Sequence, residues 1–217
     1  MRIIFVYLFI SIIFSCNQGE LEVESFDKND MLEYVKTFKN ENDTSTYYIK
    51  YFNPDGSIKC EGVKSNNEKE GKWKYYKNHK LIAVEKFNKG LLTDTQTFYF
   101  SDGKLDRFKI LDQPIPCFCD TQLHYSFKQV AFWRNGKLRE INHIKNCEFD
   151  GRTQLYDSVT GKLTTEFYEI EGLKNGPYKG ISMDTILIGN YEEGEPVGIW
   201  KTFKAGKLIH EEEYSKN

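Results

Sequence analysis

Apolar and polar residues alternate in short stretches along most of the chain, and each stretch ends at a turn signal. The clearest marker is a Lys-Leu pair that directly follows a tight-turn pair such as Asp102-Gly103 or Asn135-Gly136. Residues of these types accept the positive φ that a short hairpin turn requires. The pattern predicts a β-hairpin at each marker. The strands are expected near residues 73–77, 80–87, 97–101, 104–110, 130–134, 137–144, 153–157, 162–170 and 200–214, the last interrupted by its turn.

The spacing of the markers indicates a repeat. The apolar residues of seven related pairs lie 23, 24, 33, 25, 24 and 21 positions apart, and they are Ile58, Leu81, Leu105, Leu138, Leu163, Leu187 and Leu208. The one long step locates an irregular insertion at about residues 111–125. A single hairpin cannot bury its apolar face, so neighbouring hairpins must complete one another's core. The prediction is an all-β fold, an elongated antiparallel β-meander of stacked hairpins of about 23 residues over residues 47–217.

A large ring recurs shortly before the turn of most hairpins. The strings GKWKYYKNHKL at 71–81 and GIWKTFKAGKL at 198–208 are nearly the same. Rings at repeat positions are first explained by packing, so we expect them to form core. They are Trp73, Tyr76, Phe100, Trp133, Tyr156, Trp200 and Phe203.

Three further rings, Tyr75, Tyr99 and Tyr168, fall outside this register. If side chains alternate between the two faces of the sheet, these rings point away from the core. They are therefore the candidates for an exposed binding surface.

The N-terminus does not follow the repeat. Met1 and Arg2 precede an apolar run through Ile13 that is too short to cross a bilayer comfortably and fits a signal peptide over residues 1–15. Ile13-Phe14-Ser15-Cys16 then resembles a bacterial lipobox, in which the cysteine becomes lipidated. The alternative is a plain signal peptide with a chance cysteine. The sequence thus predicts an exported protein of the bacterial cell envelope, held at a membrane by acyl chains on Cys16.

Two segments separate this signal from the repeats. Residues 16–30 are polar and acidic and predict a tether. Residues 31–46 form an N-terminal cap, for which the helical spacing of Met31, Leu32, Val35 and Phe38 favours a short helix. The same residues, with Tyr34 and Thr37 between them, also suit a first strand, and the sequence leaves both open.

The repeat also resembles a known family. Gly-x-Trp-x-x-aromatic, followed by a turn, Gly-Lys-Leu and a polar strand, is similar to the MORN-type repeat in its bacterial variant, which is labelled as an antitoxin family. The resemblance covers roughly residues 47–214 and is best at 71–81, 98–105, 132–138 and 198–208. It implies an elongated, twisted sheet with a grooved face, used as a scaffold, a lipid-contacting surface or a partner-binding surface, without a shared chemistry.

Charge and residue types narrow the function classes. The chain of 217 residues carries 30 basic and 32 acidic residues, a net charge of −2, and so lacks the basic field of a nucleic-acid-binding protein. His79, His124, His143 and His210 lie in different repeat units, and no phosphate-binding loop or metalloprotease motif occurs. We therefore expect no catalytic site, cofactor, metal or nucleic-acid partner.

Four cysteines remain after Cys16. Cys117 and Cys119 lie in the insertion, which can lean far enough for one of them to form a disulfide with Cys147, whereas Cys60 is expected to be unpaired. Four free thiols are the first alternative. Zinc held by Cys117, Cys119, His143 and Cys147 is the second, although the C-x-C spacing is short for zinc.

Three functions are compatible with these observations. The first is a membrane-anchored lipoprotein whose repeat sheet is a non-enzymatic binding or scaffold module for an unknown protein or envelope partner. The second is an antitoxin or immunity-like protein that neutralises a toxin partner. The third is an enzyme with an unrecognised site near the insertion at residues 111–125.

Overall fold

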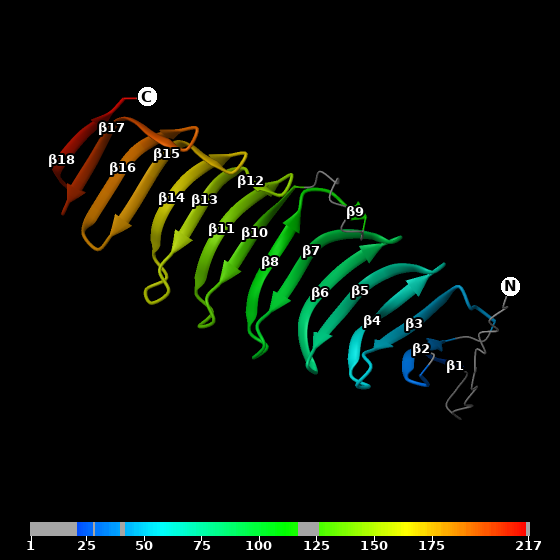
Figure 1. Ribbon diagram of the computed structural model, residues 1–217. Coiled ribbons are helices and arrows are strands. Elements are labelled where there is room, and N and C mark those ends of the chain that lie inside the picture. The colour runs from blue at the N-terminus through cyan, green and yellow to red at the C-terminus, as the bar shows by residue number, and fades with distance from the viewer. Residues whose placement is uncertain (1–20, 28, 40–41, 117–125, 216–217) are drawn as a thin grey trace. The chain divides into compact units, whose positions relative to one another are not determined.

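The computed structural model describes residues 21–215 apart from residues 28, 40–41 and 117–125 (Figure 1). Every regular element in these ranges is a β-strand, so the predicted all-β class is confirmed. The chain forms two compact units. The N-terminal unit holds the described residues up to Thr93 with Ser101–Gly103 and residues 114–116, and the C-terminal unit holds Asp94–Phe100, Lys104–Gln113 and the described residues from 126 onwards.

The N-terminal unit is an antiparallel meander in which strands β1 to β6 pair in chain order (Figure 1). The short strand β9 pairs with the first residues of β7. The strands are β1 (Leu21–Phe26), β2 (Leu32–Phe38), β3 (Thr46–Phe52), β4 (Ile58–Ser65), β5 (Glu68–Lys77), β6 (Lys80–Asn88), β7 (Leu91–Tyr99) and β9 (Ile115–Pro116).

The C-terminal unit continues the same pattern from the remainder of β7. Strand β8 pairs with β10 across the insertion, and β11 pairs with both β12 and β13. The strands are β8 (Leu105–Leu111), β10 (Ser126–Phe132), β11 (Leu138–Lys145), β12 (Glu148–Phe149), β13 (Gly151–Tyr156), β14 (Leu163–Ile170), β15 (Leu173–Ser182), β16 (Thr185–Glu192), β17 (Glu195–Lys204) and β18 (Lys207–Tyr214).

Residues before the repeats form strands rather than a tether and a helix. Strand β2 occupies the segment for which a helix was one possibility, and β1 lies within the segment assigned to the acidic tether. The two strands pair with each other, for example at Glu24↔Val35, and Ser25 is buried. Pairing explains the difference, because a polar strand becomes stable once a neighbour satisfies its backbone groups.

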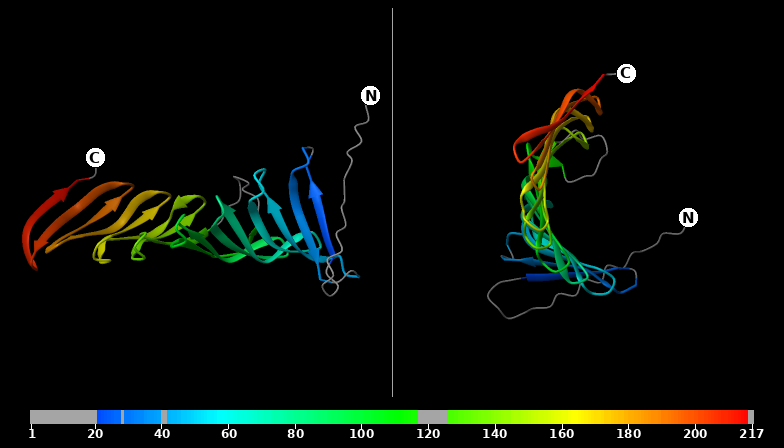
Figure 2. Two further views of the ribbon diagram at one scale, coloured as in Figure 1. Left: turned by 90° about the horizontal axis from the view of Figure 1, so that it is seen from below. Right: turned by 90° about the vertical axis from the view of Figure 1, so that its left-hand side faces the viewer.

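The turns form where the sequence places them. Ala205-Gly206 has positive φ at both residues, the conformation of a two-residue hairpin turn. Asn78-His79 adopts it without glycine, with φ of 50° and 61°. In most hairpins the second strand also carries a β-bulge near its start, as at Ile82, the extra residue between Leu81 and Ala83, which pair with Tyr76 and Tyr75. Bulges increase strand bending, and the strands of the C-terminal unit curve in a common sense (Figure 2).

Each unit has one face covered by buried or half-buried rings, called here the ring face, and an opposite outer face. In the N-terminal unit Trp73 and Phe87 are fully buried and their rings meet edge to face at 6.4 Å. In the C-terminal unit Trp200 packs against Tyr178 at 5.4 Å and Tyr191 at 5.1 Å. The prediction that these two tryptophans belong to the core is confirmed.

The prediction of one continuous ladder of core rings is wrong. Trp133 lies at a turn and is 36% exposed, with its indole N–H donating to the Tyr156 carbonyl at 3.1 Å. Tyr76 lies on the outer face, where its hydroxyl donates to Glu61 at 2.6 Å. The reason is geometric, because residues three apart in a strand point to opposite faces.

Candidate functional site

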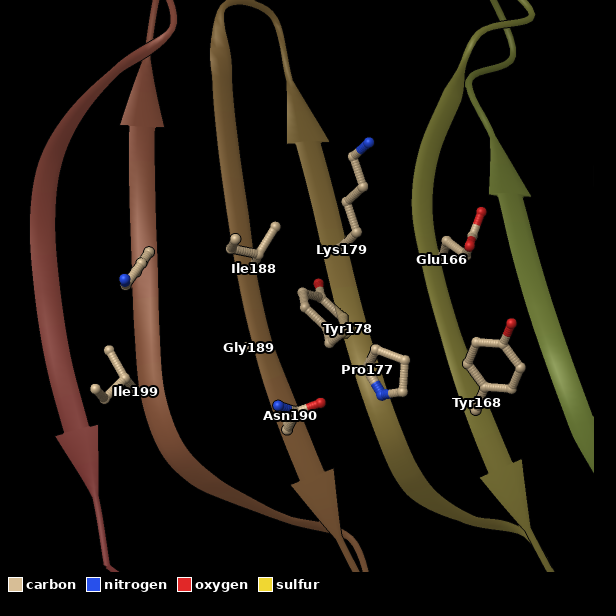
Figure 3. A pocket seen from close by; sticks show the side chains of 10 residues that line it. Glu166, Tyr168, Pro177, Tyr178, Lys179, Ile188, Gly189, Asn190 and Ile199 are labelled. Carbon is tan, nitrogen blue, oxygen red and sulfur yellow. The ribbon is translucent and has the colours of Figure 1, made fainter.

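The outer face of the C-terminal unit carries an open groove of about 660 Å³ across strands β14 to β17 (Figure 3). Tyr168, Ile188 and Ile199 line it and are 37%, 37% and 50% exposed. Pro177 adds to the apolar lining. Ile199 points to this face because it directly precedes Trp200 of the ring face, and successive side chains of a strand alternate between the two faces.

Charged groups surround this apolar centre, and two of them, Glu166 and Lys201, are paired. Glu166 accepts hydrogen bonds from Arg152 at 2.6 Å and Gln154 at 3.1 Å. The bond from Arg152 lowers the pKa of Glu166, against a smaller effect of burial. Lys201 forms an ion pair with Glu211 at 3.5 Å. An apolar centre with a polar rim is the arrangement of protein–protein interfaces.

The three tyrosines predicted to form a binding surface do not lie together. Tyr168 lines the groove, as a binding residue there should. Tyr99 ends β7 and pairs with Leu105 of β8, and it corresponds to Tyr76 of β5, which pairs with Leu81 of β6. Tyr75 belongs to the N-terminal unit.

The prediction that Tyr75 points away from Trp73 is wrong. The Tyr75 hydroxyl accepts a hydrogen bond from Lys69 at 2.8 Å, and the same ammonium lies 4.8 Å from the Trp73 ring centroid. Tyr75 thus shares the ring face, because residues two apart in a strand point the same way.

Sequence reasoning missed Ile188 and Ile199. The signal was present, because Ile188 follows Leu187 and Ile199 precedes Trp200. Adjacent apolar residues in a strand place one on each face, so these pairs indicate that both faces carry apolar surface.

Three polar side chains meet at the base of the insertion. His143 Nε2 lies 3.1 Å from both Asp112 Oδ2 and Ser126 Oγ, and its Nδ1 lies 2.9 Å from the Asp150 carbonyl oxygen. The Ser126 hydroxyl donates to Asp112. This hydrogen bond is the main cause that lowers the pKa of the Asp112 carboxyl, with His143 acting in the same direction.

This cluster has the residue types of a hydrolase triad but a different geometry. In a triad the carboxylate binds the imidazole nitrogen opposite the serine, so that the other nitrogen accepts the hydroxyl proton. Here Asp112 and Ser126 share one nitrogen, and the hydroxyl proton is directed to the carboxylate. The arrangement holds the ends of β8 and β10 together. The Asp112 backbone N–H, which donates to the Ser126 carbonyl at 3.1 Å, has the same effect.

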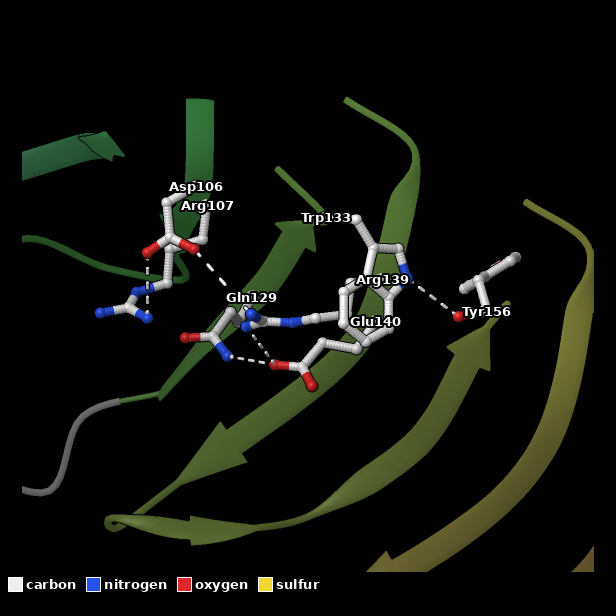
Figure 4. A network of polar contacts seen from close by, with 7 residues as sticks. All are labelled: Asp106, Arg107, Gln129, Trp133, Arg139, Glu140 and Tyr156. Carbon is white, nitrogen blue, oxygen red and sulfur yellow. Dashed lines mark hydrogen bonds and ion pairs between the residues drawn. The ribbon is translucent and has the colours of Figure 1, made fainter. Parts of the chain in front are cut away.

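A second polar network ties β8, β10 and β11 of the C-terminal unit (Figure 4). Asp106 lies 3.3 Å from Arg107 and 4.0 Å from Arg139, and Arg139 lies 3.5 Å from Glu140. Gln129 donates to Glu140 at 3.1 Å. The network pairs half-buried charges between strands, although Arg107 Nε is buried without a hydrogen-bond partner among the described residues.

The outer face of the N-terminal unit holds a buried carboxylate. Burial raises the pKa of Glu61, but hydrogen bonds from Tyr48 and Tyr76 and the nearby Lys74 ammonium outweigh it and lower that pKa overall. Burial and the Glu61 carboxylate raise the pKa of Tyr76 to about 12. Lys74 lies 3.8 Å from Glu61. The site is closed by its own side chains.

The predicted lipidation site Cys16 and the insertion cysteines Cys117 and Cys119 lie outside the described residues. Cys147 is exposed in the turn between β11 and β12, so its disulfide stays a prediction. Cys60 has a free thiol whose pKa is raised by burial. Within the residues that the structure describes, no three His, Cys, Asp or Glu side chains gather as a metal site would require. The same ranges contain no helix of the length and apolarity needed to span a membrane.

These features define a class: an all-β protein of repeat-like hairpins with an open groove on one face of its C-terminal unit. Neither the comparison with protein-family models nor the search of curated proteins finds a match to this chain. The resemblance to MORN-type repeats therefore stays a prediction, and function is argued from the surfaces themselves.

Proposed function

We propose that this chain is the non-enzymatic binding module of an exported bacterial lipoprotein. It is attached to a membrane of the cell envelope through Cys16 and binds a protein partner in the groove of the C-terminal unit. The observation that supports this proposal is the exposure of Tyr168, Ile188 and Ile199 in one groove. Exposed apolar side chains that are scattered need no explanation, whereas a contiguous patch rimmed by charges is typical of an interaction surface.

The groove suits a partner with aliphatic or aromatic side chains at the centre of its contact surface. Each apolar side chain that becomes fully buried contributes about 1.5 to 3 kcal/mol relative to full exposure, so half-exposed side chains contribute less. The paired charges at the rim, Glu166 with Arg152 and Lys201 with Glu211, add orientation more than affinity.

The test is affinity capture from envelope extracts with the full chain and two variants. Ile199→Glu places a charge in the groove and should abolish capture of the partner. Met183→Glu is the matched control, because Met183 is fully exposed in a turn outside the groove, and it should leave capture unchanged. Equal loss, or no loss, in both variants would remove the groove from the proposal. Turnover of a small molecule by the purified chain would contradict a non-enzymatic role.

The anchor is tested separately. Labelling with an acyl probe should mark the wild-type protein, and Cys16→Ser should release it from membranes. An unlabelled, soluble mature chain would contradict the lipoprotein assignment. If the captured partner is a toxin, the binding function is that of an antitoxin or immunity-like protein.

A further inference from the structure

Strands β5, β15 and β17 are each ten residues long, and each has a large ring of the ring face as its sixth residue. The second residue is a lysine in β5 and β15 and a proline in β17. The same repeat position can therefore be compared with and without an ammonium group. The residues concerned are Lys69 and Trp73 in β5, Lys174 and Tyr178 in β15, and Pro196 and Trp200 in β17.

In the two hairpins with a lysine, its ammonium group lies over the rings of the ring face. Lys69 Nζ lies 4.8 Å from the Trp73 ring centroid and 4.7 Å from that of Phe87. Lys174 Nζ lies 4.8 Å from the ring centroid of Tyr191, on the second strand of its hairpin. A cation at such a distance is attracted by the negative face of an aromatic ring. These rings thus form cation sites that the chain occupies with its own lysines.

The hairpin of β17 keeps the rings and lacks the ammonium group. It is related to the hairpin of β5 by a constant shift of 127 positions, which relates Phe87 to Tyr214 but Lys69 to Pro196. Among the residues that the structure describes, no ammonium or guanidinium group lies over the rings of Trp200 and Tyr214. Tyr214 is 37% exposed, whereas Phe87 at the corresponding position is 1% exposed.

A carboxylate is present at both tryptophan sites. Glu85 is the cross-strand partner of Trp73, and Glu212, at the same shift of 127 positions, is the cross-strand partner of Trp200. The Glu212 carboxylate accepts a hydrogen bond from the Tyr214 hydroxyl at 2.9 Å. The C-terminal site therefore combines aromatic rings with a negative charge at a position where the chain supplies no cation of its own.

A cavity of about 250 Å³ lies beside Trp200, and its lining includes Tyr191, Pro196, Glu212 and Tyr214. The indole meets the ring of Tyr191 at 88° and the ring of Tyr214 at 68°, with centroids 5.1 Å and 6.0 Å apart. Rings inclined in this way form walls rather than a stack. The volume lies below the usual range of about 300 to 1,000 Å³ for ligand pockets, so a ligand here is small.

We infer that this cavity binds a small organic cation with a methylated ammonium group, which lies against Trp200 and Tyr214 beside Glu212. The ligand supplies the charge that Lys69 supplies at the corresponding site. A primary ammonium group has three N–H donors to satisfy, whereas most of the lining is apolar or aromatic. A methylated ammonium group needs few acceptors and is the cation that aromatic cages bind. The inference is independent of the groove on the outer face.

The test is a titration of the folded full chain with choline, followed by backbone amide NMR shifts. His210 Nε2 lies 3.8 Å from the Glu212 carboxylate and opposes a cation only when it is protonated, so the titration is run at pH 8. Wild type should show saturable shifts around Trp200, Glu212 and Tyr214, with a dissociation constant on the order of 1 to 10 mM.

Two further probes separate the charge of choline from its methyl groups. The neutral tert-butyl analogue of choline has a carbon atom in place of the nitrogen, and ethanolamine has the charge without the methyl groups. Each should bind at least about fivefold more weakly than choline. Equal binding of the neutral analogue would show an apolar cavity only, and equal binding of ethanolamine would show an ion pair only. Either result would overturn the inference.

The deciding variant is Pro196→Lys, which places in β17 the ammonium group that Lys69 and Lys174 supply in the other two hairpins. This group should occupy the rings, so the variant should bind choline at least about tenfold more weakly than wild type. Pro196→Gln is the matched control, because it removes the proline without adding a charge, and its affinity should stay within about twofold of wild type. Equal affinities of Pro196→Lys and wild type would contradict the inference.

A second pair of variants decides the question if Pro196→Lys does not fold. Glu212→Gln should weaken choline binding about threefold or more, because it removes the carboxylate at the cavity. Glu213→Gln changes the net charge equally, but Glu213 is the partner of Ile199 on the outer face, so choline binding should not change. Both glutamates are exposed, so neither variant should prevent folding. Equal affinities in this pair, or no saturable shift up to roughly 50 mM choline, would also overturn the inference.

Discussion

The sites of Trp73 and Trp200 share their backbone arrangement but differ in the hydrogen bonding of the indole N–H. Trp73 is fully buried and its N–H donates to the Val63 carbonyl at 3.0 Å. Trp200 is 7% exposed, and its buried indole nitrogen has no hydrogen-bond partner among the described residues. The Lys69 ammonium lies over the Trp73 ring, whereas Tyr178, Tyr191 and Tyr214 surround the Trp200 ring.

The shared features belong to the backbone. Gly71 and Gly198 have φ of 64° and 66°, a conformation that L side chains rarely adopt. A Cβ at Gly62 would lie 2.5 Å from the Trp73 ring, and one at Gly189 would lie 2.2 Å from the Trp200 ring. Each tryptophan thus packs directly on the bare backbone of the preceding strand.

The differing features belong to the side chains, and they extend to the outer face. The shift of 127 positions relates buried Glu61 to Ile188, which is 37% exposed in the groove. In the N-terminal unit Tyr48 and Tyr76 form hydrogen bonds with the residue at this position, whereas in the C-terminal unit the residue is exposed. The comparison teaches that the repeat sets the strand path, while the chemistry of each face depends on positions that the repeat leaves variable.

The largest expected effect is the loss of either indole. Trp73→Ala should lower the free energy of unfolding by about 4 to 5 kcal/mol and Trp200→Ala by about 3 kcal/mol. The difference follows because an unpaired buried N–H already destabilises the second site. Urea denaturation followed by far-ultraviolet circular dichroism measures both. Trp133→Ala is the control, since this exposed ring should contribute about 1 kcal/mol or less. A larger effect at Trp200 than at Trp73 would contradict the comparison.

A smaller effect is expected from filling the glycine positions beneath the rings. Gly62→Ala and Gly189→Ala should each destabilise by about 2 to 3 kcal/mol, because the new methyl group overlaps a ring that cannot leave the core. The control is Gly180→Ala, whose Cβ would meet the Tyr178 hydroxyl end at 3.1 Å and should change stability by about 0.5 kcal/mol or less. Denaturant unfolding checks all three. If the three variants lose the same free energy of unfolding, overlap of the new methyl group with an indole ring is not the cause of the destabilisation.

The smallest expected effect is a pH dependence of stability that comes from Glu61 of the N-terminal unit. The corresponding residue of the C-terminal unit, Ile188, does not titrate. The folded-state pKa of Glu61 lies below its ordinary value of 4.5, so its contribution to stability is complete above that value. The contribution is lost as the pH falls through the folded-state pKa. Glu61→Gln should therefore flatten the fall in stability below about pH 4.5, measured as urea midpoints across an acid series. An unchanged acid slope would show that other carboxylates cause it.

Turn chemistry and ring spacing predicted the hairpins well, because both depend on neighbouring residues. The strands named from the sequence all form, although β5 and β7 begin several residues earlier than expected. Faces were predicted less well. The alternation of side chains along β5 places Tyr75 with Trp73 and Tyr76 on the opposite face, which the repeat pattern alone did not reveal.

The candidate sites depended still more on tertiary structure. The groove joins Tyr168, Ile188 and Ile199 from three strands, and only the first was predicted from the sequence. The register that sets Lys64 opposite Lys69 is likewise fixed by how β4 and β5 align. Asp112, Ser126 and His143 likewise meet only because β8, β10 and β11 are neighbours.

The sequence by itself determined the hairpin repeat, the positions of its turns, the location of the insertion and the burial of Trp73 and Trp200. These features follow from local backbone preferences and from a period that residues within one hairpin already express. The tertiary structure alone decided which rings share a face, which charges oppose each other and where apolar side chains remain exposed. Those depend on register and bulges between strands, and a shift of one residue there moves a side chain to the other face of the sheet.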